Sequence, residues 1–211
     1  MIKSGESAEW RKGRGPEFGR EQRPDCLSTE KGCGMQYISR DQTPLGGVLL
    51  AADETGLTGL WFEGQKYFAQ GLDGEHEERE SPLLAQAKAW LAVYFSGREP
   101  EFEVPLHLMG TDFQKEVWAL LRAIPYGQTT TYGALAARLA AQRGLPHLSP
   151  QAVGGAVGHN KVSILVPCHR VVGAHGSLTG YAGGIDKKRA LLALEKADMA
   201  ALFAPKRGTA L

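Results

Sequence analysis

The stretch SILVPCHR, residues 163–170, places a cysteine and a histidine side by side at the end of a short apolar run. The run predicts a buried strand that ends at the cysteine. The imidazole next to Cys168 is expected to be oriented by a carboxylate further along the chain. Such an imidazole is expected to lower the pKa of the Cys168 thiol and to raise the nucleophilicity of the sulfur. The alternative is that Cys168 only fills core volume, because free cysteine is among the most buried residue types.

The composition is that of a globular protein. Of 211 residues, 43% are hydrophobic, which suits one large domain or two small ones with a buried core. No apolar run reaches the roughly 18 residues of a membrane span, and the N-terminal residues do not have the pattern of a signal peptide. We therefore expect a cytoplasmic monomer that binds no membrane. The spacing of Cys26 and Cys33 is not that of zinc ligands, so no metal site is predicted.

Charge is divided unequally along the chain. Residues 35–108 carry 5 Lys and Arg against 12 Asp and Glu, whereas residues 109–211 carry 12 against 5. A basic domain favours binding to a polyanion, because affinity for nucleic acid comes mainly from neutralised phosphates. Segregation by chance or for domain docking is the alternative.

The pattern in the first half predicts a small α+β domain over residues 35–108. The residues before it, 1–34, are rich in charge, Gly and Pro and are expected to be a disordered extension, and residues 198–211 are expected to be a C-terminal tail. Ser81 is a suitable N-cap for a helix that Gly97 ends. Three short strands in an antiparallel meander are predicted at 36–39, 48–52 and 57–62.

The second half, residues 109–197, predicts a helical domain. Thr111 and Gln114 match a capping box, ahead of an apolar stripe that Pro125 ends. Two shorter helices are predicted at 132–140 and 150–158. They make a helix-turn-helix, whose second helix is expected to enter a DNA groove.

The second of these helices consists mostly of small, uncharged residues. It is either a tightly packed buried helix or a helix whose backbone approaches a nucleic-acid groove closely. Residues 174–184, rich in Gly, Ser and Thr, predict a wing or loop over the thiol. Asp186 is expected to cap a last helix, which carries Glu195 near its end. Residues 109–197 are therefore predicted to be a winged helix-turn-helix domain that carries the active site.

Ordered motifs over roughly residues 35–197 resemble the O6-alkylguanine-DNA alkyltransferases. The resemblance implies a repair protein that flips an O6-alkylated guanine out of double-stranded DNA and moves the alkyl group to its own cysteine. The transfer would be irreversible, would occur once per molecule and would need no cofactor; activity on O4-alkylthymine stays open. The motifs are Phe113-Gln114, Val117-Trp118, Pro125-Tyr126-Gly127, Thr131-Tyr132-Gly133, Ala152-Val153-Gly154, Asn160, the run 164–172 and Gly180-Tyr181-Ala182-Gly183-Gly184.

The resemblance also implies catalytic roles. Cys168 would be the acceptor, and Glu195 would orient His169, which would take the thiol proton through a water. Tyr132 would donate a hydrogen bond to O6 as negative charge develops there. Asn160 would bridge the recognition helix and the active-site strand. Three of these roles have a structural alternative: Tyr132 as a packing aromatic residue, His169 as a core histidine and Glu195 as a solvated helix charge.

Further residues would contact the substrate. Tyr181 and Ala182 would wall the pocket of the flipped base. Gln151, Ala152 and Gly155 would face the DNA from the recognition helix.

Two other functions fit parts of the pattern. A non-catalytic sensor of alkylguanine would lack the acceptor cysteine, whereas this chain has Cys168. A cysteine hydrolase could use Cys168, His169 and Glu195 as a triad, but it would leave the helix-turn-helix without a role. Arg170 is expected to form a structural ion pair.

Gln151 stands where many members of the resembled family place an arginine that fills the gap left by the extruded base. Glutamine can occupy the same space but contributes no positive charge. We therefore predict that Gln151→Arg binds duplex DNA with one lesion more tightly than the parent does, measured by titration at fixed salt. Equal affinity and equal rate in the two proteins would refute this interpretation.

Overall fold

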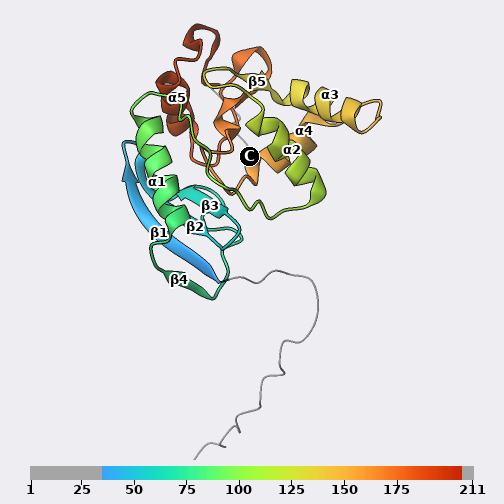
Figure 1. Ribbon diagram of the computed structural model, residues 1–211. Helices are drawn as coiled ribbons and strands as arrows, with labels where there is room; N and C mark the ends of the chain where they lie inside the picture. Colours follow the sequence, from blue (N-terminus) through green and yellow to red (C-terminus); the bar gives the residue numbers. More distant parts are fainter. Residues whose placement is uncertain (1–34, 206–211) are drawn as a thin grey trace, which may run out of the picture. The chain divides into compact units, whose positions relative to one another are not determined.

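The protein is of the α+β class in the computed structural model, which describes residues 35–205 (Figure 1). A sheet with one helix comes first, and a group of helices follows. The predicted extension over residues 1–34, residues 206–211 of the predicted tail, and both Cys26 and Cys33 lie outside the described residues. Among residues 35–205, no helix has both the length and the apolar composition needed to cross a membrane.

The N-terminal sheet contains the predicted antiparallel meander. Its strands are β1 Gln36–Thr43, β2 Gly46–Ala52 and β3 Leu57–Phe62. Strand β1 is longer than predicted, because it continues to a tight turn in which Gly46 has a φ of 111°. A fourth strand, β4 (His76–Glu78), pairs in parallel with β1 and gives the order β3-β2-β1-β4. The sequence did not predict β4, because its three residues are all exposed and polar.

Helix α1, Pro82–Phe95, packs its apolar face against this sheet. The predicted cap is present, since the Ser81 hydroxyl accepts a hydrogen bond from the N–H of Leu84. Tyr94, near the C-terminal end of α1, is fully buried. The buried side of α1 consists of Leu84, Ala87, Leu91 and Tyr94.

The second half contains the predicted helices. They are α2 Asp112–Arg122, α3 Tyr132–Gln142, α4 Pro150–Gly158 and α5 Ile185–Leu194. Both bonds of the capping box between Thr111 and Gln114 are present. The prediction for Asp186 was wrong: Gly184, with a φ of 90°, is the N-cap of α5, no side chain caps this end, and Asp186 lies in the first turn.

The predicted strand before Cys168 is absent. Residues 163–165 form turns, Ile164 has a φ of 71°, and Cys168–Arg170 form a short 3-10 helix, η1. Ile164 and Val166 are buried and Leu165 is partly buried, but Pro167 has no N–H for a strand ladder. The remaining short elements are β5 Thr130–Thr131, which pairs in parallel with β6 Val171–Val172, and the 3-10 turns η2 Ala174–Gly176 and η3 Met199–Ala201.

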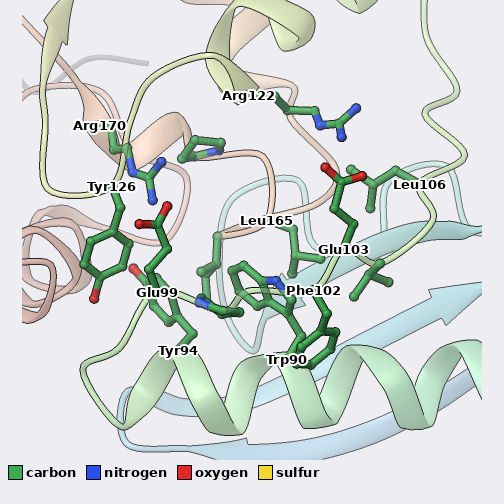
Figure 2. Close-up of a pocket in the computed structure, with 14 residues that line it drawn as sticks. Trp90, Tyr94, Glu99, Phe102, Glu103, Leu106, Arg122, Tyr126, Leu165 and Arg170 are labelled. Carbon is green, nitrogen blue, oxygen red and sulfur yellow. The ribbon is translucent and has the colours of Figure 1, made fainter.

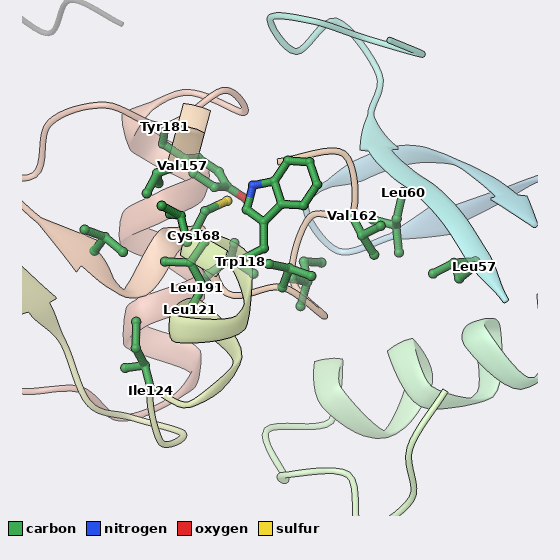
Figure 3. Close-up of a cluster of buried hydrophobic side chains, with 14 of the residues drawn as sticks. Leu57, Leu60, Trp118, Leu121, Ile124, Val157, Val162, Cys168, Tyr181 and Leu191 are labelled. Atoms are coloured by element: carbon green, nitrogen blue, oxygen red, sulfur yellow. The ribbon is translucent and has the colours of Figure 1, made fainter. Parts of the chain in front are cut away.

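One apolar core joins the two halves of the described chain (Figure 3). The backbone of Leu60 in β3 donates to the carbonyl of Lys161 at 2.8 Å and accepts from the N–H of Ser163 at 2.9 Å. Trp118 is 1% exposed, and its indole N–H donates to the carbonyl of Ala156 in α4 at 2.9 Å. Strand β3 thus holds the turn before the cysteine, and Trp118 ties α2 to α4 within the same core.

The capping box of α2 provides a test of the local energetics. We predict that Thr111→Ala lowers the free energy of unfolding by about 1 kcal/mol, because the variant loses the side-chain oxygen that accepts from the N–H of Gln114. Urea unfolding measures the change. Thr55→Ala is the matched control, since Thr55 lies in an exposed turn, and it should shift stability by less than about 0.5 kcal/mol. Equal shifts in the two variants would contradict the capping role.

Candidate active site

Cys168 lies in η1, where it is 5% exposed. The side-chain amide of Asn160, the second residue after α4, donates to Cys168 Sγ at 3.1 Å and to the carbonyl of Val166 at 2.8 Å. The Asn160 carbonyl oxygen accepts from the N–H of Val162 at 3.0 Å. Asn160 therefore connects the end of α4 with the cysteine turn, in the position predicted for a bridge, although the segment that it holds is a turn and not a strand.

His169 and Glu195 are in direct contact. The imidazole Nε2 of His169 lies 2.7 Å from Oε1 of Glu195, and both side chains are fully buried. His169 Nδ1 is also buried and has no hydrogen-bond partner in the described chain. With Nε2 donating to the carboxylate, Nδ1 of the neutral ring is left as a proton acceptor.

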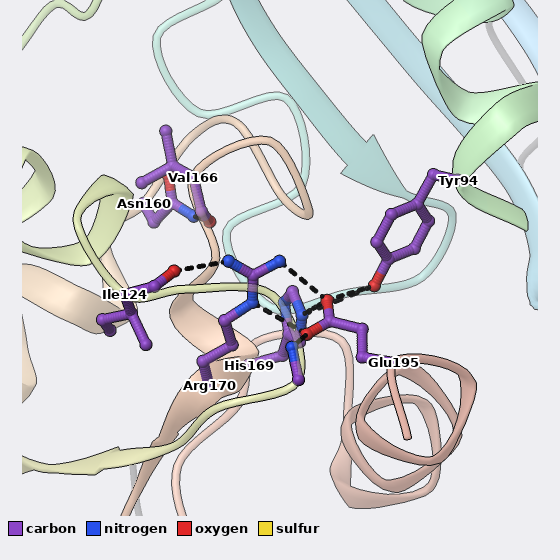
Figure 4. A network of polar contacts seen from close by, with 8 residues as sticks. Tyr94, Ile124, Asn160, Val166, His169, Arg170 and Glu195 are labelled. Atoms are coloured by element: carbon purple, nitrogen blue, oxygen red, sulfur yellow. Dashed lines mark hydrogen bonds and ion pairs between the residues drawn. The ribbon is translucent and has the colours of Figure 1, made fainter. Parts of the chain in front are cut away.

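Glu195, the C-cap of α5, is the centre of a polar network (Figure 4). Arg170 donates to Glu195 Oε2 from Nε at 2.8 Å and to Oε1 from Nη2 at 3.1 Å, as expected for a structural ion pair. The N–H of Gly127 donates to Oε2 at 3.1 Å, and the hydroxyl of Tyr94 donates to Oε1 at 2.7 Å. Burial by itself would raise the pKa of Glu195, but the hydrogen bonds and charges of His169 and Arg170 lower it to about 2.

Burial disfavours the charged forms of both the thiol and the imidazole. Burial raises the pKa of Cys168, and the hydrogen bond from Asn160 and the charge of Lys188 offset only part of that rise. Burial lowers the pKa of His169, against the opposing pull of Glu195. The expectation of a lowered thiol pKa was therefore wrong, because removal of the sulfur from water outweighs its favourable neighbours.

Lys188 is a buried cation near the thiol that sequence reasoning missed. It is 0% exposed, and its ammonium group donates to the carbonyls of Val171 and, at 2.7 Å, Thr179. Burial lowers the pKa of Lys188 to about 8. In the sequence Lys188 stands in a basic cluster that is typical of an exposed helix face. The one sequence feature that points to a place near the site is its spacing of seven residues from Glu195, which is two turns along the same helix face.

Tyr132 lines a groove between α3, α4 and the loop after β6. The groove has a volume of about 600 Å³. The hydroxyl of Tyr132 donates to the carbonyl of Gly180 at 2.9 Å, and burial together with the nearby Cys168 raises its pKa. The lining residues are Thr131, Tyr132, Gly133, Pro150, Gln151, Gly154, Gly155, Ala174, Thr179 and Gly180.

The face of α4 that borders this groove is open. Gln151, Ala152 and Gly155 are exposed, whereas Val153 and Ala156 are buried in the core. A Cβ added at Gly155 would meet no atom within 4 Å, so packing within the protein does not require a glycine there. The small residues of α4 therefore have two surroundings. One side of the helix packs tightly in the core, and the other side is open to solvent.

Of the predicted site residues, only Tyr132, Gln151 and Gly155 line the groove within the described chain. The predicted residues outside its lining are Ala152, Asn160, Cys168, His169, Tyr181, Ala182 and Glu195. Tyr181 is 7% exposed, and its ring stands edge-on to His169 with 6.5 Å between the ring centroids. The carbonyl of Ala182 accepts a hydrogen bond from the backbone N–H of Lys66 at 3.0 Å, which ties this loop to the N-terminal half. Within residues 35–205, no group of three or more His, Cys, Asp or Glu side chains is placed to hold a metal ion.

Comparisons with known proteins cover both halves of the chain. The ribonuclease-like domain of 6-O-methylguanine DNA methyltransferase matches residues 36–108, and the DNA binding domain of the same family matches residues 112–197. The methylated-DNA--protein-cysteine methyltransferase of Mycobacterium tuberculosis H37Rv is 44% identical over 162 residues, which are 77% of this chain and 93% of the relative. The protein of the same name from Methanosarcina acetivorans is 44% identical over 159 residues, 75% of this chain and 97% of the relative.

A solved structure is also similar. The crystal structure of Mycobacterium tuberculosis OGT in complex with DNA is 42% identical and has a TM-score of 0.65. The similarity covers 81% of this chain and 96% of that chain.

The low pKa of Glu195 makes stability depend on pH. With a folded pKa of about 2 against the ordinary 4.5, the carboxylate stabilises the fold fully above about pH 4.5 and loses this contribution as the pH falls toward 2. We predict that Glu195→Gln lowers the free energy of unfolding by about 3 kcal/mol at pH 7 and that the difference from the parent shrinks at pH 3. Urea unfolding over a pH series measures it.

Glu116→Gln is the matched control, because Glu116 pairs with Arg143 at the exposed surface, where solvent screens the interaction. Its effect should be small at every pH. A loss in Glu195→Gln that stays constant from pH 7 to pH 3 would contradict the assignment of the charge to Glu195.

Proposed function

Because the chain belongs to the 6-O-methylguanine DNA methyltransferase family, we propose that it repairs alkylated DNA directly, by moving an alkyl group from O6 of guanine to the sulfur of Cys168. The observation that carries this proposal is the placement of the buried Cys168 thiol on the amide of Asn160, next to a His169–Glu195 pair whose Nδ1 has no hydrogen-bond partner in the described chain. These groups supply an acceptor, a base and a group that orients the base.

The proposed chemistry begins with transfer of a proton from Cys168 to His169. His169 Nδ1 takes the Cys168 proton through a bridging water, and Glu195 stabilises the imidazolium that forms. The amide N–H of Asn160 and the positive charge of Lys188 stabilise the thiolate.

The thiolate then attacks the alkyl carbon. The S–C bond forms as the C–O6 bond breaks, and the electron pair of that bond stays on the guanine oxygen. The Tyr132 hydroxyl turns from Gly180 toward O6 and stabilises the developing charge. The product is a thioether, so each molecule reacts once, and no cofactor takes part.

The substrate is O6-alkylguanine in double-stranded DNA, bound by a monomer. The helix-turn-helix α3–α4 presents its open face to the duplex, and the groove of about 600 Å³ beside Tyr132 receives the flipped base. Gln151 lies exposed at the start of α4, where it can fill the gap in the stack. The Mycobacterium tuberculosis relative crystallised with DNA supports DNA as the partner. We also propose that residues 35–108 and 109–197 are two domains that pack together through the shared apolar core.

The test is transfer of a labelled methyl group. Duplex DNA with O6-methylguanine labelled in the methyl carbon is expected to leave one label per protein molecule, on Cys168 by peptide mass analysis. Cys168→Ser should bind the DNA and take up no label, while Cys26→Ser and Cys33→Ser should behave as the parent. Binding by the parent without label would show a lesion sensor, and turnover of an ester substrate would show a cysteine hydrolase; either result overturns the proposal.

A further inference from the structure

Tyr94 connects the N-terminal half to the network around Glu195. It belongs to α1, yet its hydroxyl lies 2.7 Å from Glu195 Oε1 and 3.5 Å from His169 Nε2 (Figure 4). The side chain is completely buried, and burial with the charge of Glu195 raises its pKa far above the ordinary value. The hydroxyl therefore keeps its proton and acts toward the carboxylate only as a donor.

Packing fixes the position of this hydroxyl. The Tyr94 ring is stacked on Trp90 with 5.3 Å between centroids and stands edge-on to Phe95 at 5.4 Å and to Tyr126 at 6.1 Å. A ring held on several sides cannot swing away from the carboxylate without disturbing the core of α1. The donor is thus as rigid as the helix that carries it.

We propose that Tyr94 is a positioning residue for alkyl transfer: its hydroxyl holds Glu195 Oε1 in line with His169 Nε2 and so keeps His169 Nδ1 turned toward the thiol. The inference rests on the proposed function and adds a residue from α1 to it. Oε1 accepts from Tyr94, His169 and Arg170. Because each donor withdraws charge from the same oxygen, Tyr94 also limits how strongly Glu195 raises the basicity of His169.

The groups around the pair define the electrostatic setting. The titratable and charged side chains that interact with His169 or Glu195 are Tyr94, Tyr126, Cys168, Arg170, Tyr181 and Lys188. Of these, Tyr94, Tyr126 and Arg170 also line a hollow of about 210 Å³ (Figure 2). The hydroxyl of Tyr126 is buried and has no hydrogen-bond partner within the described residues. Tyr126→Phe is therefore a matched control: it removes the same hydroxyl group from a tyrosine that lines the same hollow but makes no hydrogen bond to Glu195.

The experiment compares Tyr94→Phe with Tyr126→Phe in the full chain. Single-turnover transfer from O6-methylguanine DNA at saturating protein is measured across pH. Tyr94→Phe should lower the plateau rate constant about tenfold, the effect of losing one hydrogen bond to a charged group, with unchanged affinity for the DNA. It should also move the acid limb of the profile toward neutral pH, because His169 becomes more basic. Tyr126→Phe should match the parent in both respects.

A graded variant keeps the test independent of folding. 3-Fluorotyrosine at position 94 retains the ring and the hydroxyl but makes the hydroxyl a stronger donor, so the acid limb should move the opposite way. The inference is overturned, and the proposed function stands, if the parent transfers the methyl group to Cys168 and both variants do so with the same rate constant and pH profile as the parent. If the parent itself transfers no label, both are overturned.

Discussion

A buried carboxylate organises the active region of this protein. Glu195 accepts hydrogen bonds from α1 through Tyr94, from the turn after α2 through the backbone of Gly127, and from η1 through His169 and Arg170. Removal of a charged carboxylate from water costs several kcal/mol unless donors surround it, and here donors occupy both oxygens. Segments far apart in the sequence must therefore come together for the charge to be tolerated, so the fold and the orientation of His169 depend on the same contacts.

The elements that the sequence predicts best are those marked by neighbouring residues, such as helix caps and apolar stripes. The caps at Ser81 and Thr111 and the stripe of α2 predict helices that the structure contains. The apolar run before Pro167 was misread as a strand, because burial looks the same in a strand and in a buried turn, and only the backbone at Ile164 tells them apart. Asp186 suggested a cap, but the positive φ of Gly184 already ends the preceding loop.

The site was visible in the sequence where neighbours or family motifs mark it, and hidden where the fold brings residues together. Cys168 and His169 are adjacent, and Asn160 and Glu195 belong to the resembled pattern. Tyr94 is 101 residues from Glu195, and its place on the apolar face of α1 makes it look like any core aromatic residue. Lys188 looked solvated, since nothing local shows that backbone carbonyls will surround its ammonium group. Whether the pKa of the Cys168 thiol is raised or lowered depends on its burial, and the dipeptide Cys168-His169 does not reveal burial.

The near-complete enclosure of Cys168 has a consequence for the lifetime of the protein. Cys168 is 5% exposed and burial raises the pKa of its thiol, so the sulfur is a poor target for small electrophiles and oxidants in solution. Under the proposed function each molecule reacts once, so a chance reaction at the sulfur would inactivate the protein without repairing DNA. Burial of Cys168 therefore makes the proton harder to remove, and it also protects the sulfur from side reactions until the proposed substrate binds.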